Sequence, residues 1–204
     1  MRGRGGFLRK AAVAALVLGT LSLGPDSARG QEGGFTFQVG GGAAIPVGDF
    51  RSREGWEGKT GAGTSFGMAF TFPLKGPLDL YMGFSQHRFD CSEEVCPGDE
   101  GFVATGFDAG LRLLLPREGV SPWLRATLHA PRVEAELVEE GRKVSRTSDG
   151  GAGLEVGGGV LIRVAQRLSL SPGIRFGMVD LPFPERPALE PRYLVADLAL
   201  VLGF

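Results

Sequence analysis

The segment RYLVADLALVLGF, residues 192–204, alternates between two kinds of position as far as its last residue, Phe204. Every second residue counted back from Phe204 is apolar: Leu202, Leu200, Leu198, Ala196 and Leu194. The other set includes Tyr193 and Asp197. A period of two predicts a β-strand with one apolar face. Soluble domains usually end in a polar tail that frays, so we expect this last strand to be paired on both edges and to belong to the fold.

The same alternation recurs along the chain. It is present in seven further segments: 34–46, 61–73, 78–90, 102–115, 121–133, 150–165 and 168–178. Most of these segments are about a dozen residues long, which exceeds the usual globular strand and fits a tilted strand that crosses a bilayer. The pattern therefore predicts eight antiparallel strands.

The connections between these segments alternate in length. LKGP (74–77), PREGV (116–120) and AQR (165–167) are short and turn-like. The connections 47–60, 91–101, 134–149 and 181–191 are longer. Short turns at one end and long loops at the other are typical of an outer-membrane barrel, with the short turns in the periplasm.

The first thirty residues have the composition of an export signal. Basic residues in MRGRGGFLRK precede an apolar run, and small residues Ala28 and Gly30 follow it. This order predicts a signal peptide over residues 1–30 and a mature domain over 31–204; an uncleaved anchor is the alternative. The mature chain then has a net charge of −5, which argues against a nucleic-acid-binding protein, since such a protein needs a basic face.

Taken together, these features resemble the small eight-stranded outer-membrane β-barrels, such as the OmpA transmembrane domain and OmpX. The resemblance is one of pattern and covers the whole predicted mature chain. It implies an all-β, eight-stranded antiparallel up-and-down transmembrane β-barrel in the outer membrane of a Gram-negative-type bacterium. It also implies that the last strand is read by the barrel assembly machinery. The residues of that signal are Tyr193, Leu198, Leu200, Leu202 and Phe204.

If the apolar faces meet lipid, the opposite faces fill the barrel. The strand phases place eight charged residues there: Asp79, Asp108, Glu155, Asp197, Arg112, Arg125, Arg163 and Arg175. Four acids match four arginines, as a nearly dry interior requires. We expect Arg175 and Asp197 to pair across neighbouring strands. An eight-stranded barrel is just wide enough for side chains to fill it, so we expect a polar plug and not a wide pore.

Two other classes of protein are weighed against this interpretation. A soluble lipocalin-like barrel has the same strand count but would line its interior with apolar residues. An outer-membrane enzyme similar to the lipid A deacylases would use a Ser–His–acid arrangement, for which Ser85 and His87 are candidates. Their order is reversed relative to that pattern and both face inward, as does His129. We therefore expect these side chains to form a polar rim at the barrel mouth, with no catalytic site, no cofactor and no metal site.

The remaining predictions concern the loops and rims. Cys91 and Cys96 are expected to form a disulfide in an exported protein. Segment 132–149 is expected to extend two strands as a hairpin, with a bulge at Pro131. Trp123 and Tyr193 are assigned to interfacial aromatic girdles. The expected role is structural or interactive, with outer-membrane lipid, lipopolysaccharide or a surface protein meeting loops 91–101 and 134–149.

Overall fold

The computed structural model describes residues 34–47, 60–90, 101–115, 117–139, 142–183 and 186–204. Within them are ten strands: β1 (Thr36–Val47), β2 (Gly63–Pro73), β3 (Leu78–Asp90), β4 (Gly101–Leu114), β5 (Val120–Glu139), β6 (Arg142–Thr147), β7 (Ala152–Arg163), β8 (Leu168–Phe183), β9 (Arg186–Leu189) and β10 (Arg192–Gly203). In this part of the chain no helix is long and apolar enough to cross a membrane. The predicted signal peptide 1–30 and the cysteines Cys91 and Cys96 lie outside the described residues.

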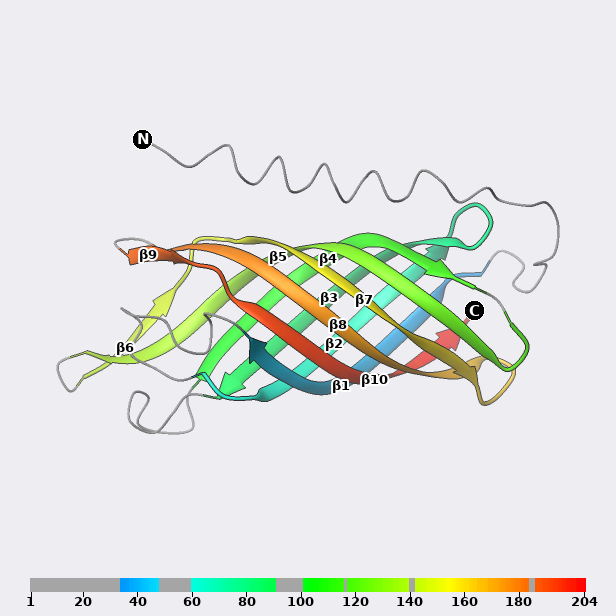
Figure 1. The fold of residues 1–204 in the computed structure, drawn as a ribbon, viewed down its shortest axis with the longest axis horizontal. Coiled ribbons are helices and arrows are strands. Elements are labelled where there is room, and N and C mark those ends of the chain that lie inside the picture. The colour runs from blue at the N-terminus through cyan, green and yellow to red at the C-terminus, as the bar shows by residue number, and fades with distance from the viewer. Residues whose placement is uncertain (1–33, 48–59, 91–100, 116, 140–141, 184–185) are drawn as a thin grey trace.

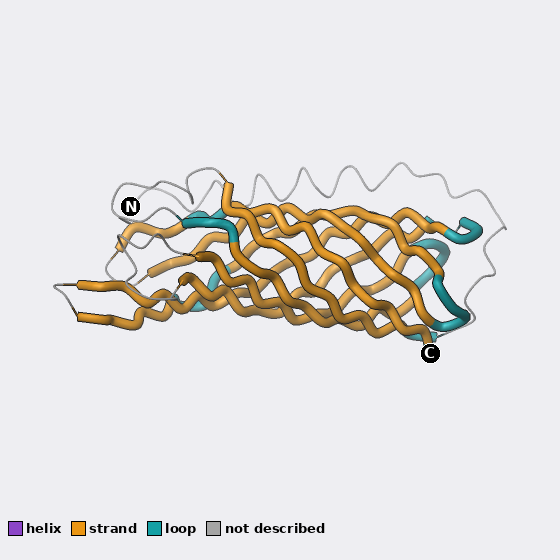
Figure 2. The backbone as a smooth tube through the Cα atoms, turned by 90° about the horizontal axis from the view of Figure 1, so that it is seen from below, coloured by secondary structure: helices purple, strands orange, loops and turns teal. Residues whose placement is uncertain are grey.

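Eight of the strands form a closed antiparallel ring. The order is β1-β2-β3-β4-β5-β7-β8, and β10 pairs with both β8 and β1 to close it. The strands are tilted and wrap around an elongated barrel (Figure 1), and Figure 2 shows the same barrel from below, with strands in orange and the connecting loops in teal. The predicted fold class, an eight-stranded antiparallel barrel, is confirmed.

The seam between the first and last strands is paired over the full length of both. Its register runs from Thr36 opposite Gly203 to Val47 opposite Arg192. The amide of Phe204 then donates to the carbonyl of Phe35 at 3.1 Å. The strand that ends the chain therefore has neighbours on both edges, which leaves no open edge for aggregation.

One end of the barrel carries the short turns 74–77 and 164–167 and the described residues 115 and 117–119; we call it the turn end and the opposite one the loop end. Gly76 and Gly119 have φ angles of +65° and +77°, which side chains with a Cβ rarely adopt. Leu74 N–H closes its turn on the carbonyl of Leu78 at 2.8 Å. The C-terminus lies at the turn end (Figure 2).

Two hairpins extend beyond the ring at the loop end. β5 continues to Glu139 and pairs there with β6, as expected for segment 132–149. The bulge predicted at Pro131 is not on β5, because the β4–β5 register is unbroken at Gly106 opposite Pro131. It is on the segment that pairs with the other edge of β5. Residues 130–133 of β5 face five residues, 148–152, so the extra residue lies between β6 and β7. Segment 181–191, expected as a loop, contains the end of β8 paired with β9.

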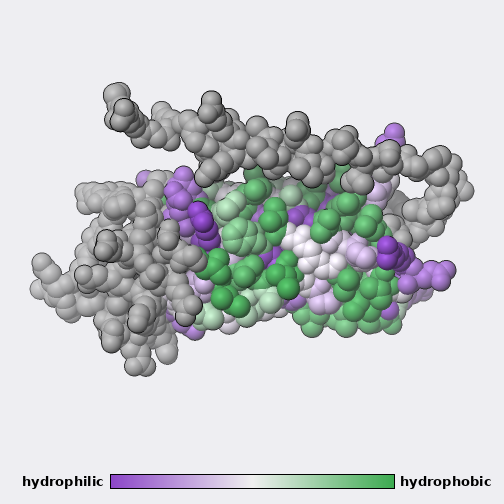
Figure 3. Space-filling view, viewed as in Figure 1, coloured by the Kyte–Doolittle hydropathy of each residue, from purple (hydrophilic) through white to green (hydrophobic). Residues whose placement is uncertain are grey.

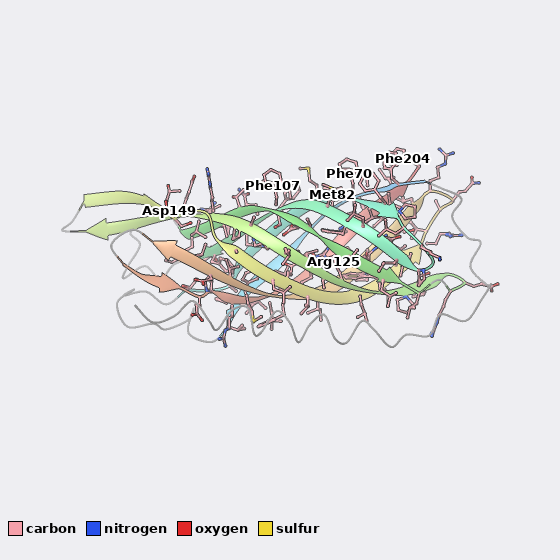
Figure 4. The ribbon with its side chains drawn as sticks, turned by 90° about the horizontal axis from the view of Figure 1, so that it is seen from above. Phe70, Met82, Phe107, Arg125, Asp149 and Phe204 are labelled. Carbon is pink, nitrogen blue, oxygen red and sulfur yellow. The ribbon has the colours of Figure 1, made fainter. Side chains whose placement is uncertain are left out.

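The outer face of the ring is apolar. Every ring strand exposes at least one large apolar side chain: Ile45, Phe66, Met82, Phe107, Leu124, Val156, Ile174 and Leu198. Hydrophobic side chains gather over the middle of the strands with hydrophilic ones nearer the ends (Figure 3), and Phe70, Met82, Phe107 and Phe204 project outward while Arg125 lies within (Figure 4). We call this outer surface the apolar belt. Such an area on a water-soluble monomer would be exceptional.

Candidate functional site

The interior at the turn end is held by one ion pair and a hydroxyl contact. Arg112 donates from Nε and Nη2 to Asp79 Oδ2, at 3.0 and 2.7 Å. The same Nη2 reaches Thr71 Oγ1 at 3.1 Å, and Thr71 contacts the hydroxyl of Thr36. Arg112 and Asp79 are neighbours because Asp79 lies directly opposite Arg112 in the β3–β4 register.

Glu155 links two arginines at the centre of the barrel. Arg125 Nη2 donates to Glu155 Oε1 at 2.8 Å, and Arg175 Nη1 donates to both of its oxygens at 3.0 and 3.1 Å. Arg175 Nη2 also lies 2.6 Å from Asp197 Oδ2, so the pair expected between β8 and β10 is present in the structure. All four groups are largely buried, and each charge has an opposite partner, which offsets the cost of removing it from water.

Trp123 and Tyr193 are among the aromatic residues that point into the barrel. Trp123 Nε1 donates to Ser171 Oγ at 3.0 Å, and the Arg125 guanidinium lies 5.8 Å from its ring centroid. The ring of Tyr193 packs against Gly177 on β8, where a Cβ would lie 2.3 Å from Tyr193 Cζ. The assignment of Trp123 and Tyr193 to interfacial girdles is therefore wrong, since both are buried inside.

Above the central network lie the two histidines, each bonded through Nδ1. His129 Nδ1 is 2.5 Å from Asp108 Oδ1, and His87 Nδ1 is 3.0 Å from Ser65 Oγ. The two imidazole rings are 6.1 Å apart between centroids. His87 thus contacts Ser65 and not the neighbour expected from sequence, Ser85, although Ser85 is also buried and faces inward.

Several buried polar atoms in this region have no protein partner, among them Nε2 of both histidines and the hydroxyl of Tyr193. Buried water ordinarily satisfies such atoms. Because these groups are enclosed, none of them reaches the outer surface of the barrel, where the Ser–His–acid arrangement weighed above would have to meet a membrane lipid. Among the described residues no three His, Cys, Asp or Glu side chains are grouped to hold a metal ion.

The interior ends at an apolar cap on the loop side. Its members are Ala44, Phe89, Phe102, Ala104, Val133, Val179, Leu181, Tyr193 and Val195. The histidines were expected at a polar rim of the barrel mouth, and this expectation is wrong because the apolar cap lies further out. The signal was present in the sequence: on β3 the inward set continues from Ser85 and His87 to Phe89, beyond the end of the apolar belt.

The structure places the remaining predicted residues as follows. Arg163, expected in the interior network, is exposed at the end of β7 near the turn end, where alternation no longer separates inside from outside. Leu198, Leu200 and Leu202 are exposed on the outer face of β10 and Phe204 is exposed directly after its end, whereas Tyr193 of the same predicted signal is inside. Phe204 stacks on Phe35 with centroids 4.8 Å apart.

The chain was compared with known proteins. No family model matches it, and no curated protein matches it in sequence. Among solved structures, Neisserial surface protein A has a TM-score of 0.64 at 16% identity, over 83% of this chain and 97% of that one. Ail, the attachment invasion locus protein of Yersinia pestis, has a TM-score of 0.56 at 16% identity, over 85% and 100%. This chain therefore has the fold of the small eight-stranded outer-membrane β-barrels.

Proposed function

We propose that this protein is an integral outer-membrane β-barrel with a structural or surface-interaction role. The observation that carries the proposal is the distribution of polarity: ion pairs fill the interior and an apolar belt covers the outside. In water this distribution would expose the oily surface and bury the charges. In a bilayer both faces are matched to their surroundings, and the closed ring leaves no strand with an unpaired edge in the hydrocarbon.

The filled interior supports a role other than that of a wide pore. The salt-bridge network occupies the centre, and the apolar cap follows it towards the loop end. A channel for solutes would need a wider ring with more strands. The purified barrel should therefore give no porin-like conductance in a planar bilayer, and a stable conductance of porin size would contradict this part of the proposal.

Localisation is tested by fractionation and by the environment of single side chains. The mature protein should fractionate with the outer membrane, and unheated and boiled samples should migrate differently on a denaturing gel. Spin labels replacing Phe107 and Leu198, in a Cys91→Ser/Cys96→Ser background, should be accessible to oxygen and shielded from a water-soluble relaxation agent. A label replacing Lys75 in a short turn is the aqueous control. Equal access of the water-soluble agent to all three positions would exclude a membrane-embedded belt.

For the surface-interaction role, we infer that the β5–β6 hairpin is the docking element. β5 pairs with β4 only as far as Ala135, and the residues beyond it pair with β6 alone. β6 pairs with no other strand in the described part of the chain. A free strand edge that extends from a membrane barrel is suited to strand addition by a protein partner. Loop 91–101 is proposed as a second contact, and lies almost wholly outside the described residues.

This role is tested by shortening the hairpin. Ala135 lies opposite Arg146, so residues 136–145 can be replaced by Asn-Gly, the preferred two-residue hairpin turn. The shortened barrel should keep its heat-dependent gel shift, because all ring pairings remain. It should no longer capture the surface proteins that the wild-type barrel captures. Undiminished capture by the shortened barrel would exclude the hairpin.

The export and assembly features belong to the same proposal. We infer that residues 1–30 are removed on export, that Cys91 and Cys96 form a disulfide, and that the barrel assembly machinery reads the last strand. Mass spectrometry of the mature protein, with and without reductant, measures the first two. A chain that retains residues 1–30, or one with two free thiols, would contradict the corresponding inference.

A further inference from the structure

The described interior contains one more carboxylate than guanidinium. Its acidic and arginine side chains are Asp79, Asp108, Glu155, Asp197, Arg112, Arg125 and Arg175. Arg163, expected as a fourth arginine, is exposed near the turn end. With both histidines neutral, four carboxylates would face three guanidiniums and leave a net charge of −1. Such an excess is unfavourable where side chains fill the space and little water enters, so we expect one further positive charge inside the barrel.

Asp108 is the carboxylate that has no guanidinium ion pair in this interior. The salt bridges described above join the three guanidiniums to the other three carboxylates. Asp108 is only 4% exposed, and its ion-pair partner is His129, whose Nδ1 lies 2.5 Å from Oδ1. The two residues are direct neighbours because they lie opposite each other in the β4–β5 register. A proton on His129 would therefore supply the missing charge where it is needed.

The two histidines differ in what their Nδ1 atoms contact. The contact of His129 with its carboxylate is as short as that of Arg175 with Asp197, at 2.5 and 2.6 Å, and such short contacts are typical of charge-assisted hydrogen bonds. His87 Nδ1 contacts the hydroxyl of Ser65 at 3.0 Å, and Arg175 Nη2 reaches the same hydroxyl at 3.4 Å. A charge on His87 would thus lie beside a guanidinium, so His129 alone is placed to hold a proton.

Other titratable or charged groups surround the pair on several strands. They are His87 on β3, Arg125 on β5, Glu155 on β7, Arg175 on β8 and Tyr193 on β10. The inward side chains of β1 and β2 in the described part of the chain carry no titratable group. His129 also lines a cavity beneath the apolar cap with room for about one water molecule, which can accept the N–H of a protonated Nε2.

We propose that His129 is an imidazolium paired with Asp108 in the folded barrel at neutral pH, so that the charge balance of the interior depends on one proton. Removing this proton would leave Asp108 as a buried charge without an opposite partner, which is costly. The pair is therefore a pH-sensitive element that stabilises the barrel while protonated and stops doing so when alkaline pH removes the proton. The inference rests on the enclosed interior and not on the surface-interaction role.

The protonation state is measured directly by nitrogen NMR of the imidazole rings in the refolded barrel. The chain has only two histidines, so a His87→Gln variant assigns both signals. At about pH 7.5, well above the ordinary range of a free imidazole, His129 should carry a proton on both ring nitrogens and His87 on one. Two neutral rings would overturn the proposal, and one equivalent of bound metal in elemental analysis would then assign the missing charge to a metal ion.

The energetic test compares the same substitution at the two histidines, by urea titration in micelles. His129→Gln leaves Asp108 unpaired and should lower the folding equilibrium constant about 100-fold or more. The matched control, His87→Gln, should have a clearly smaller effect. Adding Asp108→Asn to His129→Gln removes the unpaired charge and should recover much of the loss, which a packing defect alone would not allow.

The pH dependence provides a readout that does not require the single variant to fold. Wild type should lose stability between about pH 7 and pH 10, because the proton of the pair is lost over that range. The Asp108→Asn/His129→Gln barrel should lose clearly less, since it has no such proton. Equal pH profiles for these two barrels, or equal losses for the two single histidine variants, would overturn the proposal.

Discussion

Glu155 balances more buried charge than the other carboxylates of the described interior, because it contacts the guanidiniums of both Arg125 and Arg175. Replacing it by Gln leaves Arg125 without its ion-pair partner and Arg175 with Asp197 alone. Removing one member of a buried ion pair costs about 3–5 kcal/mol. Glu155→Gln should therefore lower the free energy of unfolding by about that amount, measured by urea titration of the refolded barrel in micelles.

Glu134→Gln is the control for that measurement, because Glu134 is exposed on the outer face of the same strand, β5, as Arg125. Its effect should stay within about 0.5 kcal/mol, as for most surface substitutions. Similar losses for the two variants would show that the central network does not contribute to stability through its charge pairing.

Gly177 provides the space in which Tyr193 lies. A Cβ at Gly177 would lie 2.3 Å from Tyr193 Cζ, and the ring is already confined by His87 and Phe89, whose centroids are 5.0 and 5.8 Å away. Gly177→Ala should therefore destabilise the barrel by about 1–3 kcal/mol, the usual cost of overpacking. Gly150→Ala, where a Cβ would meet no atom within 4 Å, should be close to neutral.

The Gly177 effect should also depend on Tyr193. If the cost comes from this contact, Gly177→Ala should be less harmful in a Tyr193→Ala background, and a double-mutant cycle measures the difference. Strictly additive losses would place the cost of Gly177→Ala elsewhere, in the backbone of β8.

At the scale of elements, β10 both closes the ring and belongs to the proposed assembly signal. A substitution of Phe204 distinguishes these two roles. Phe204 stacks on Phe35 with an interplanar angle of 11°, a contact worth about 0.5–1.5 kcal/mol. Phe204→Ala should therefore change the stability of the refolded barrel modestly. In cells it should reduce the folded, heat-modifiable fraction several-fold, measured by semi-native gels of outer membranes.

Phe66→Ala is the comparison for β10, because Phe66 is also exposed on the apolar belt but lies in β2, away from the chain end. It should leave the folded fraction in cells close to that of wild type. An equal loss of assembly for both variants would mean that belt hydrophobicity, and not the terminal position, controls assembly.

Elements also differ in how far the sequence predicts them. Period-two alternation predicts a strand and its two faces together, so the ring, the Arg175–Asp197 contact and the inward histidines follow from local pattern. Trp123 and Tyr193 were misplaced because residue type alone favours an interfacial girdle for them. What decides their position is non-local: Gly159 and Gly173 leave room for Trp123, and Gly177 leaves room for Tyr193, on other strands.

The loop end was predicted least well, for a related physical reason. Beyond the apolar belt the strands still alternate between buried and exposed positions, but the polarity of the two faces is reversed. On β3 and β5, for example, buried Phe89 and Val133 are followed by exposed Asp90 and Glu134. A strand phase read from outward apolar residues therefore does not predict this region. The apolar cap around Phe89, Val133 and Leu181 brings together side chains from strands distant in sequence. Neither that assembly nor the placement of the extra residue between β6 and β7 is encoded in any single segment.

For the whole molecule, the decisive property is which surface meets hydrocarbon. Leu198 on β10 and Leu74 in a short turn are equally exposed, at 53%, but Leu198 lies near the middle of the belt and Leu74 at its edge. Arginine on the lipid face of a barrel costs about 2–4 kcal/mol at the bilayer midplane and about 0–1 near the interface. Leu198→Arg should thus be destabilising by about 2–4 kcal/mol in lipid vesicles and Leu74→Arg nearly neutral, measured by unfolding titrations.

In a water-soluble barrel both substitutions would be harmless, since each would replace an exposed apolar group with a hydrated one. Depth-dependent loss of stability is therefore the behaviour that distinguishes a membrane barrel from a soluble one of the same strand count, and equal, small effects at the two positions would rule out the membrane assignment.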